Sequence, residues 1–493
     1  MASKTFHVQI VTPPFLPTPS FAHTADIIYL FFSSVLSAAK TSLPAPGSAL
    51  AAAPLRKKSP NPDFVQSAAV RMLQILSIAT SVERSINLLI QHQCPQCGSP
   101  AVLKETDRLF DCQYCRVKSY LFQKDFFRYM FPSAAPKDKD LVFFPYWRFK
   151  GMLFSCVESG IKHRFVDVSQ QAVESRFFPA SVGLRSQALK LSFVTKETPG
   201  RFLKPTLSFK QVLKNFNRKI STTLPKPVYH QAHIGETLSL IYSPFYENDK
   251  MYDAVLNRPV TSVLPDDFDT MLFSNERPDW RIHFIPIICP GCGWDLYGQR
   301  ESLVLPCKNC NTVWRPEKNK LKKLKFACIP GEGENIIFLP YWRIKAEIPE
   351  IELRSYADLV SIANLPKAVQ KEWKDIEFRF WALAFKVRPQ VFIRLARHVT
   401  LSQPQEKLEN ELPDARLYPV TLPVEEALES LTINLASFVK PRKDFFPALQ
   451  DLSIKPERYL LVYIPFIERH HELVQPELNL AINKKQLALA ANL

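Results

Sequence analysis

The sequence predicts an α+β protein made of two copies of one unit, in which each copy is a four-cysteine ribbon followed by a β-rich α+β module. Three observations predict this class. The cysteines occur in two matching sets, short motifs recur in the same order in both halves, and strands with a period of two occur together with isolated amphipathic helices. Strands combined with separate helices are typical of α+β folds rather than of regular βαβ arrays.

The composition narrows the classes of protein that fit. Of the 493 residues, 46% are hydrophobic and 12% aromatic, which is enough to bury a large core, so the chain is not disordered as a whole. It holds only 12 glycines, and neither a G-x-x-x-x-G-K-S/T loop nor a G-x-G-x-x-G turn occurs. Nucleotide-driven motors and Rossmann dehydrogenases are therefore disfavoured. No apolar run reaches the ~20 residues of a membrane-spanning helix.

Eight of the ten cysteines form four C-x2-C pairs, grouped in two sets. Each pair turns two thiolates towards one point, and two pairs on a short hairpin complete a tetrahedral S4 site. In both sets 14 residues separate the two pairs, which is close to the spacing of four-cysteine zinc sites. Gly98 and Gly293 follow the first pair of each set, where a positive φ is expected. The predicted ligands are Cys94, Cys97, Cys112, Cys115, Cys289, Cys292, Cys307 and Cys310.

Structural Zn²⁺, two ions per chain, is the favoured occupant because both sets are complete and leave no open coordination position. Rubredoxin-like iron is an alternative, although rubredoxin separates its pairs by a longer stretch. Disulfides are disfavoured, since C-x-x-C pairs without a convincing secretory signal indicate a reducing compartment, and we expect a cytoplasmic protein. The two cysteines without a counterpart, Cys156 and Cys328, are expected to be small buried core residues.

The chain is predicted to be an internal duplication. Each cysteine of the first set recurs 195 positions later, from Cys94 to Cys289 and so on to Cys115 and Cys310. Further motifs follow in the same order, with offsets that grow because of insertions in the second half. They are Pro-Tyr-Trp-Arg at 145–148 and 340–343, Arg-x-Gln at 185–187 and 388–390, and Tyr-x-Pro-Phe at 242–245 and 463–466.

Both Pro-Tyr-Trp-Arg segments predict half-buried strands, because their apolar and polar residues alternate. Trp147 and Trp342 are expected to pack into the core. The opposite face is interpreted as an ordinary solvated surface, or alternatively as a contact surface for a ligand or nucleic acid. The residues of that face are Tyr146, Arg148, Lys150, Tyr341, Arg343 and Lys345.

Three amphipathic patterns predict helices, at 207–220, 366–380 and 421–438. In the last of these, Pro423 lies near the first helical position, and Glu425 and Glu426 lie in the first turn.

The N-terminal residues lie outside the repeat. Residues 1–63 are expected to form a low-order extension, with a linker rich in proline, alanine and serine at 41–63. The apolar run at 27–39 is too short to span a bilayer and its flanks fit a signal peptide poorly, so membrane-surface contact by the N-terminus is disfavoured but stays open. Residues 64–93 are predicted to form a helix that leads into the first ribbon.

A formal net charge of +16 favours anionic partners in general. The sharpest cluster directly follows the last cysteine of the second set and suggests a surface that contacts phosphates of a nucleic acid. The favoured alternative is a solvated strand or loop of which only Leu321 and Leu324 are buried. The basic residues are Arg315, Lys318, Lys320, Lys322, Lys323 and Lys325.

The sequence shows no active site, since neither an H-E-x-x-H nor a G-x-S-x-G motif occurs. The C-P-x-C-G and C-x-x-C knuckles resemble those of zinc ribbons in transcription factors, in ribosomal proteins and in the primosomal helicase of replication restart. This resemblance implies zinc at the eight cysteines and nothing about activity. The tandem arrangement suggests a bacterial family of zinc-ribbon proteins.

We therefore expect a zinc-binding, non-catalytic protein that acts as a binding or assembly module with a protein partner. The alternatives are a nucleic-acid-binding factor that uses the second ribbon and its basic tail, and a rubredoxin-like electron carrier. The predicted domains are an extension (1–63), a lead-in helix (64–93), ribbon 1 (94–130), module 1 (131–280), ribbon 2 (281–325) and module 2 (326–493).

Overall fold

A computed structural model describes residues 89–122, 125–183, 185–260, 283–317, 320–331 and 333–488. The predicted N-terminal extension and most of the lead-in helix lie outside these residues. The end of the predicted helix is wrong, because Leu89–Gln93 forms strand β1. This strand pairs antiparallel with β2 (Pro100–Lys104), so the first cysteine pair lies in the turn of a hairpin. None of the described helices is long and apolar enough to cross a membrane.

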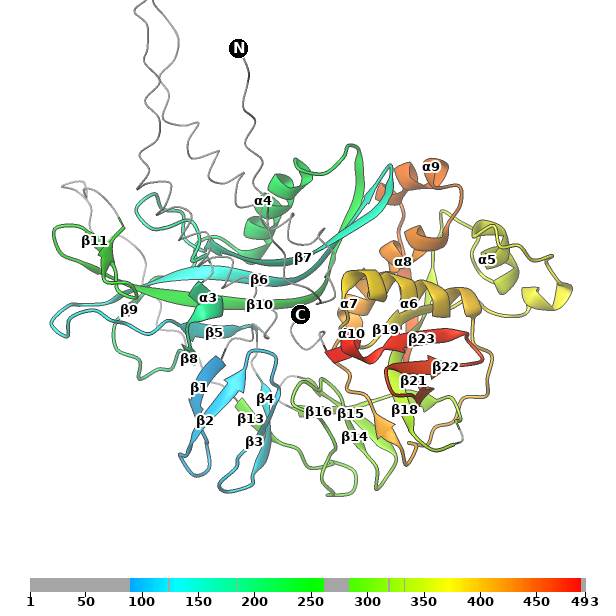
Figure 1. The fold of residues 1–493 in the computed structure, drawn as a ribbon, viewed down its shortest axis with the longest axis horizontal. Helices are drawn as coiled ribbons and strands as arrows, with labels where there is room; N and C mark the ends of the chain where they lie inside the picture. Colours follow the sequence, from blue (N-terminus) through cyan, green and yellow to red (C-terminus); the bar gives the residue numbers. More distant parts are fainter. Residues whose placement is uncertain are drawn as a thin grey trace, which may run out of the picture. The chain divides into compact units, whose positions relative to one another are not determined.

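Each ribbon contains a three-stranded antiparallel sheet (Figure 1). In ribbon 1, β3 (Leu109–Asp111) and β4 (Lys118–Phe122) form a hairpin, and β4 also pairs with β13 (His283–Pro286), which precedes the second cysteine set. In ribbon 2, the order is β14-β15-β16. These strands are β14 (Leu305–Cys307), β15 (Thr312–Glu317) and β16 (Lys320–Leu324).

The third strands of the two ribbon sheets, β13 and β16, occupy equivalent positions, because each pairs with the second strand of the hairpin in its sheet. On β4, the pairing with β13 begins at Ser119, opposite Pro286. On β15, the residue 195 positions after Ser119 is Trp314, which pairs with Lys323 of β16. Ribbon 1 therefore takes its third strand from a segment far along the chain, whereas ribbon 2 supplies its own.

Module 1 is organised around one long antiparallel ladder between β6 (Val142–Val157) and β10 (Val228–Glu247), which Figure 1 shows side by side. The pairs β10–β5 and β6–β9 are parallel, and β7 and β11 continue the antiparallel pairing on β6 and β10. The other elements are β5 (Phe127–Met130), β7 (Gly160–Gln171), α3 (Arg185–Ala188), β8 (Leu191–Phe193), β9 (Arg201–Phe202), α4 (Phe209–Ser221), β11 (Met251–Asp253) and β12 (Arg258–Pro259).

Module 2 is organised in the same way around β18 (Ile336–Glu347) and β21 (Lys455–Glu468). Its strands are β17 (Phe326–Cys328), β19 (Phe380–Leu383), β20 (Arg416–Leu417), β22 (Glu472–Gln475) and β23 (Leu480–Asn483). Its helices are α5 (Tyr356–Ile362), η2 (Lys371–Lys374), α6 (Pro389–Ser402), α7 (Val424–Glu429), α8 (Leu431–Phe438), α9 (Arg442–Phe445), η3 (Phe446–Gln450) and α10 (Lys484–Ala488).

The two ladders have matching register. The proline of each Pro-Tyr-Trp-Arg segment pairs with the tyrosine of the Tyr-x-Pro-Phe segment in the same half, Pro145 with Tyr242 and Pro340 with Tyr463. The parallel neighbours match as well, because β9 meets β6 at Val142 and β20 meets β18 at position 337, which is 195 residues later. The predicted strands are therefore confirmed, and their pairing repeats from one half to the other.

The tryptophans of the repeated motif have matching contacts too. The indole N–H of Trp147 donates to the carbonyl of Leu207 (2.8 Å), and that of Trp342 donates to the carbonyl of Leu422 (3.0 Å). Both carbonyls directly precede a helix N-cap, so each tryptophan ties its strand to the start of a helix. The prediction that both tryptophans pack in the core is confirmed.

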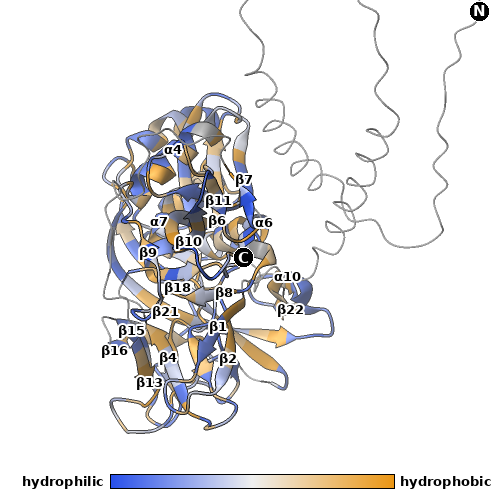
Figure 2. Ribbon diagram, turned by 90° about the vertical axis from the view of Figure 1, so that its left-hand side faces the viewer, coloured by the Kyte–Doolittle hydropathy of each residue, from blue (hydrophilic) through white to orange (hydrophobic). Residues whose placement is uncertain are grey.

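One hydrophobic cluster contains residues of both modules. The far ends of β6 and β10 contribute Met152, Phe154 and Ile234 to a cluster whose remaining members come mainly from module 2. The rings of Phe154 and Phe392, on α6, lie 5.9 Å apart. The apolar positions of the strands that carry this core can be followed in Figure 2.

Two of the three predicted helices are confirmed, and one is wrong. α4 matches the prediction at 207–220, and α7 and α8 divide the one at 421–438, with Pro423 as the N-cap of α7. Residues 366–380 contain only the short η2 and the start of β19. Here Ile376 and Phe378 use their backbone groups to bond Tyr356 and Arg354 (both 2.8 Å), which removes them from an i, i+4 ladder.

Candidate metal centres

The sequence brings four cysteines together in each ribbon because each C-x2-C pair occupies one tight turn. Within each set, the sulfur atoms all lie within 4.8 Å of one another. The shortest separations are 3.7 Å for Cys94–Cys115 and Cys97–Cys112, and 3.5 Å for Cys292–Cys307. The metal ligands predicted from the sequence are thus brought together in two clusters.

The sulfur separations fit a tetrahedral metal. Four thiolates at the ~2.3 Å Zn–S distance stand about 3.8 Å apart at tetrahedral geometry. A disulfide requires ~2.05 Å between sulfurs, and all ten cysteines are free thiols. An S4 set of this size suits zinc or iron, so the geometry establishes two possible metal sites without naming the ion.

A left-handed residue closes every one of the four turns. Gly98 and Gly293 have φ of +71° and +74°, as expected from the sequence. The corresponding residues of the second pairs, Arg116 and Asn311, have φ of +58° and +49°. In the turn at Cys94, the amide of Gly98 donates to the carbonyl of Cys94 (2.8 Å), which closes the turn around the cysteine pair.

The burial of the ligands is the same in both centres. The first cysteine of each pair is buried, and the second is exposed or half-buried. Each buried sulfur belongs to a hydrophobic cluster, since Cys94 and Cys112 pack with module 1 and Cys289 and Cys307 pack between the ribbons. The metal centres therefore lie at the edge of packed cores.

A hydroxyl group next to the sulfurs occurs in both centres at different sequence positions. In ribbon 1, the Ser99 hydroxyl lies 3.2 Å from the sulfur of Cys97 and 3.4 Å from that of Cys112. In ribbon 2, the hydroxyl of Thr312 lies 3.0 Å from the sulfur of Cys310 and accepts the indole N–H of Trp314 (2.9 Å). Such neighbours orient ligands and stabilise thiolates. The sequence analysis missed both residues, and only their position beside a knuckle marks them.

Hydrogen bonds favour the thiolate form at two of the ligands. The Ser99 hydroxyl and the backbone amides of the knuckle lower the pKa of Cys112 to about 6. Burial opposes ionisation of Cys289, but the amides of Gly291 and Cys292 lower its pKa to about 6. These amides converge on sulfur as expected for a thiolate that ligates a metal. Burial raises the pKa of Cys156 and Cys328, which lie outside both clusters, to about 12, in agreement with their prediction as core residues.

The two ribbons are packed against each other. The backbone amide of Leu109 donates to the carbonyl of Arg300 (2.9 Å), and the Thr106 hydroxyl donates to Glu301 (3.0 Å). Gly298 makes the approach possible, because a Cβ there would lie 2.5 Å from Leu109 and 2.8 Å from Leu305. Their shared cluster contains residues of both ribbons, including the ligands Cys289 and Cys307.

The strand face opposite the tryptophans, expected to be a solvated surface or alternatively a contact surface, is not exposed at most of its residues, so the expected exposure is wrong there. Tyr146, Arg148, Lys150 and Tyr341 are buried. The prediction failed because β6 is covered on both faces, so its alternation separates two buried environments instead of an inside and an outside. Of the remaining residues, Arg343 is half-buried, and Lys345 pairs with Glu377 (2.8 Å) and Glu457 (2.9 Å).

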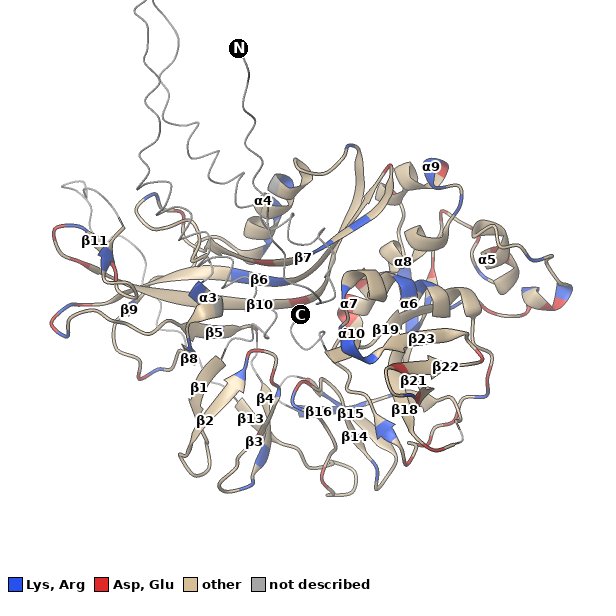
Figure 3. Ribbon diagram, viewed as in Figure 1, with Lys and Arg blue, Asp and Glu red and all other residues tan. Residues whose placement is uncertain are grey.

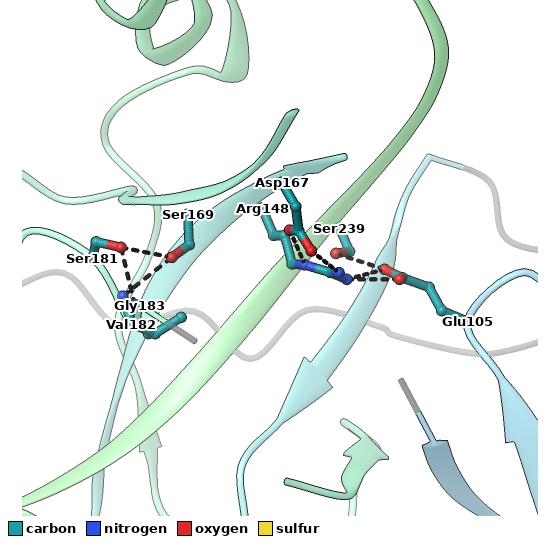
Figure 4. A network of polar contacts seen from close by, with 8 residues as sticks. All are labelled: Glu105, Arg148, Asp167, Ser169, Ser181, Val182, Gly183 and Ser239. Carbon is teal, nitrogen blue, oxygen red and sulfur yellow. Dashed lines mark hydrogen bonds and ion pairs between the residues drawn. The ribbon is translucent and has the colours of Figure 1, made fainter. Parts of the chain in front are cut away.

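Arg148 is the centre of a buried ion network (Figure 4). Its guanidinium contacts Glu105 (2.6 Å) from the turn after β2 and Asp167 (2.9 Å) from β7. Ser239 of β10 donates to Glu105 (3.5 Å). The network therefore joins the ribbon 1 hairpin to the central ladder of module 1. Nothing in the local sequence marks Glu105 or Asp167 as its members.

Some residues of the basic tail of ribbon 2 form ion pairs and others are exposed. Arg315 pairs with Glu425 (2.6 Å) and Lys322 with Glu317 (3.4 Å), whereas Lys318 lies outside the described residues. The remaining lysines, Lys320, Lys323 and Lys325, are exposed on or beside β16, the outer strand of its sheet. As the alternative interpretation expects, Leu324 is buried, and Leu321 is half-buried.

Comparison of the chain with protein-family models, with curated proteins and with solved structures finds no match.

Proposed function

We propose that the protein is a non-catalytic, zinc-dependent binding module, in which two structural Zn²⁺ ions hold a pair of ribbons that bind a protein partner. The observation that carries this proposal is the closed S4 geometry of both centres, since structural zinc sites use four protein ligands and catalytic ones keep a position open. Zinc is favoured over iron because it is the common occupant of C-x2-C ribbons. The thiolate ligands fit a reducing compartment, the cytoplasm.

The chain is best explained as a duplicated unit. The matching registers of the two ladders, the matching tryptophan contacts and the equal burial of both cysteine sets support one ancestral ribbon and module. In this proposal each ribbon binds its own metal ion, because two ligand cysteines of each ribbon are packed in a hydrophobic cluster.

The exposed apolar side chains point to the ribbons as the binding surface. A large share of the exposed large apolar residues lies on ribbon segments, and aromatic residues among them stand next to the knuckles. Tyr114 is 71% exposed and Trp294 is 63% exposed. Exposed aromatic groups on a rigid support are typical of protein-binding sites. The ribbon residues concerned are Val102, Tyr114, Val117, Ile288, Trp294 and Tyr297, and Leu89 lies on β1, directly before ribbon 1.

The first test measures the metal. Elemental analysis of the purified full chain should give two zinc ions, and one in Cys289→Ser, whereas Cys156→Ala should keep two. Iron in place of zinc, or fewer than about two ions in the unmodified chain, would contradict this part of the proposal.

The second test concerns the partner. Affinity purification from the native host is compared between the unmodified chain, a Tyr114→Ser/Trp294→Ser/Tyr297→Ser variant and a control variant, Val369→Ser/Tyr459→Ser, whose exposed residues lie on module 2. A defined protein that the first variant loses and the control keeps would support the proposal. Equal recovery from both variants would contradict it.

A nucleic-acid partner is the second candidate, favoured by the exposed lysines of β16 close in sequence to the exposed Trp294 and Tyr297. Neutralising Lys320, Lys322, Lys323 and Lys325 should then abolish binding of single-stranded DNA or RNA, and binding by the unmodified chain should fall steeply with salt. Unchanged binding in this variant would exclude β16 as the contact surface.

A further inference from the structure

A cavity of about 590 Å³ lies away from the metal centres, where module 1 meets the helices of module 2. Its walls come from the turn between β6 and β7, from one face of α6, and from α8 and α9. The lining residues are Ser159, Gly160, Ile161, His163, Gln390, Ile393, Arg394, Arg397, His398, Leu401, Ser437 and Arg442. A volume of this size is typical of sites for small molecules.

The ionisable side chains of the lining are all basic. The lining contains three arginines and two histidines and no carboxylate. In Figure 3, which marks lysine and arginine in blue, α6 carries blue segments, and α9 carries blue beside the red of Asp444, which does not line the cavity. Among the described residues, no ion pair neutralises Arg394, Arg397 or Arg442. The lining therefore presents uncompensated positive charge.

Two of the arginines repel each other. Burial, followed by the charge of Arg442, lowers the pKa of Arg397. The buried Nε of Arg397 has no hydrogen-bond partner among the described residues. The guanidinium of Arg442 lies beside Gly160, where a Cβ would stand only 3.3 Å from its Nη1. A buried donor without a partner beside a like charge is unfavourable unless an anion compensates it.

Other contacts hold the walls in place. The Nη2 of Arg394 donates to the carbonyl of Ala481 (3.2 Å), and the Nε2 of His398 hydrogen-bonds to the carbonyl of Leu478 (2.6 Å). These bonds tie the lining face of α6 to the segment at the end of module 2. Arg394 and His398 are thus held in position on the α6 wall before any ligand arrives, which reduces the entropy lost on binding.

The same cavity also has an apolar wall. Ile161, at the start of β7, faces the cavity together with Ile393 and Leu401, which lie on α6. A bare inorganic anion would make no use of these side chains. A ligand with an organic part could bury that part against them.

From this arrangement we propose that the cavity binds a small organic phosphate, with its phosphoryl group between Arg397 and Arg442 and its organic part against Ile161, Ile393 and Leu401. Guanidinium groups bind phosphoryl oxygens through paired hydrogen bonds, which suits the two arginines. This site does not depend on the function proposed for the ribbons. It uses side chains alone, which agrees with the absence of glycine-rich phosphate loops from the sequence.

The test uses isothermal titration calorimetry of the zinc-loaded full chain with three probes: AMP, inorganic phosphate and uncharged adenosine. We expect AMP to bind more tightly than inorganic phosphate, and adenosine to bind least. Arg397→Gln and Arg442→Gln should each weaken AMP binding at least tenfold. Lys443→Gln is the matched control, because Lys443 is an exposed cation on α9 that lies outside the lining.

Three outcomes would overturn the proposal. They are no AMP binding at millimolar concentration, equal affinity in the unmodified chain and both arginine variants, or an equal loss in Lys443→Gln, which would indicate unspecific attraction by net charge. Circular dichroism and zinc content of each variant must match those of the unmodified chain. Should Arg397→Gln fail this check, the exposed Arg442→Gln alone decides the result.

Discussion

The carboxylate of Glu105 lies 2.6 Å from the guanidinium of Arg148, and both side chains are buried. Glu105 comes from the turn of a metal-binding ribbon and Arg148 from the middle strand of module 1. The pair therefore connects the metal-binding part of the chain to its largest sheet by a contact that water does not screen.

Replacing Glu105 by Gln should lower the free energy of unfolding by about 3 kcal/mol, because a buried cation loses one of its two countercharges. Urea denaturation of the zinc-loaded chain measures this loss. The control, Asp125→Asn, removes the partly exposed partner of Arg128 and should cost less than about 1 kcal/mol. Equal losses in the two variants would contradict a special role for Glu105.

Ser99→Ala and Thr312→Val should each weaken zinc binding at their own ribbon by roughly tenfold or more, since both remove a hydroxyl that contacts the ligand sulfurs. Competition with a chromophoric chelator resolves the two sites. In each variant the other ribbon serves as the internal control, and an equal loss at both sites would show that the hydroxyls do not act locally.

Gly298→Ala should destabilise the contact between the ribbons by about 1–3 kcal/mol, because the added Cβ would overlap Leu109 and Leu305. Gly291→Ala is the matched control in the same ribbon, since its Cβ would meet neighbours only at 3.7 Å and beyond. Thermal unfolding followed by circular dichroism compares them. Equal stability of the two variants would contradict the prediction, because it would show that the contact between the ribbons accommodates a Cβ at position 298.

Glu236 should contribute a stabilisation that decreases as the pH rises from about 5 to about 7. Burial, with a smaller effect of Glu429, raises the pKa of Glu236 from 4.5 to about 7. Between these values the folded state binds a proton that the unfolded chain releases, so folding is favoured at the acidic end and loses this advantage as the carboxyl ionises.

Glu236→Gln should flatten that dependence, because glutamine mimics the protonated carboxyl at every pH. Urea midpoints at pH 5.5, 6.5, 7.5 and 8.5 measure it. Glu247→Gln, at the exposed end of the same strand, should leave the slope unchanged. A slope that is identical in Glu236→Gln and the unmodified chain would contradict the assignment.

The metal clusters and the strands of the repeated motifs could be predicted from the sequence because their determinants are local, whereas the pairing of these strands into two ladders could not. Four knuckles with regular spacing define the sulfur clusters, and the repeated motifs mark the four long strands of the two ladders. The burial of Arg148 could not be predicted, since its partners Glu105 and Asp167 lie in other elements. The same holds for residues 366–380, whose helical pattern is overridden by backbone bonds to the segment before α5.

The lysine-rich strand β16 has a consequence for contacts between molecules. In ribbon 1, β4 pairs with β13 from the segment before the second cysteine set. In ribbon 2, the corresponding side of β15 pairs with β16, which is the outer strand of its sheet and carries exposed lysines. Charged side chains on an outer strand oppose the addition of a strand from another molecule, so β16 protects this edge of the sheet from aggregation.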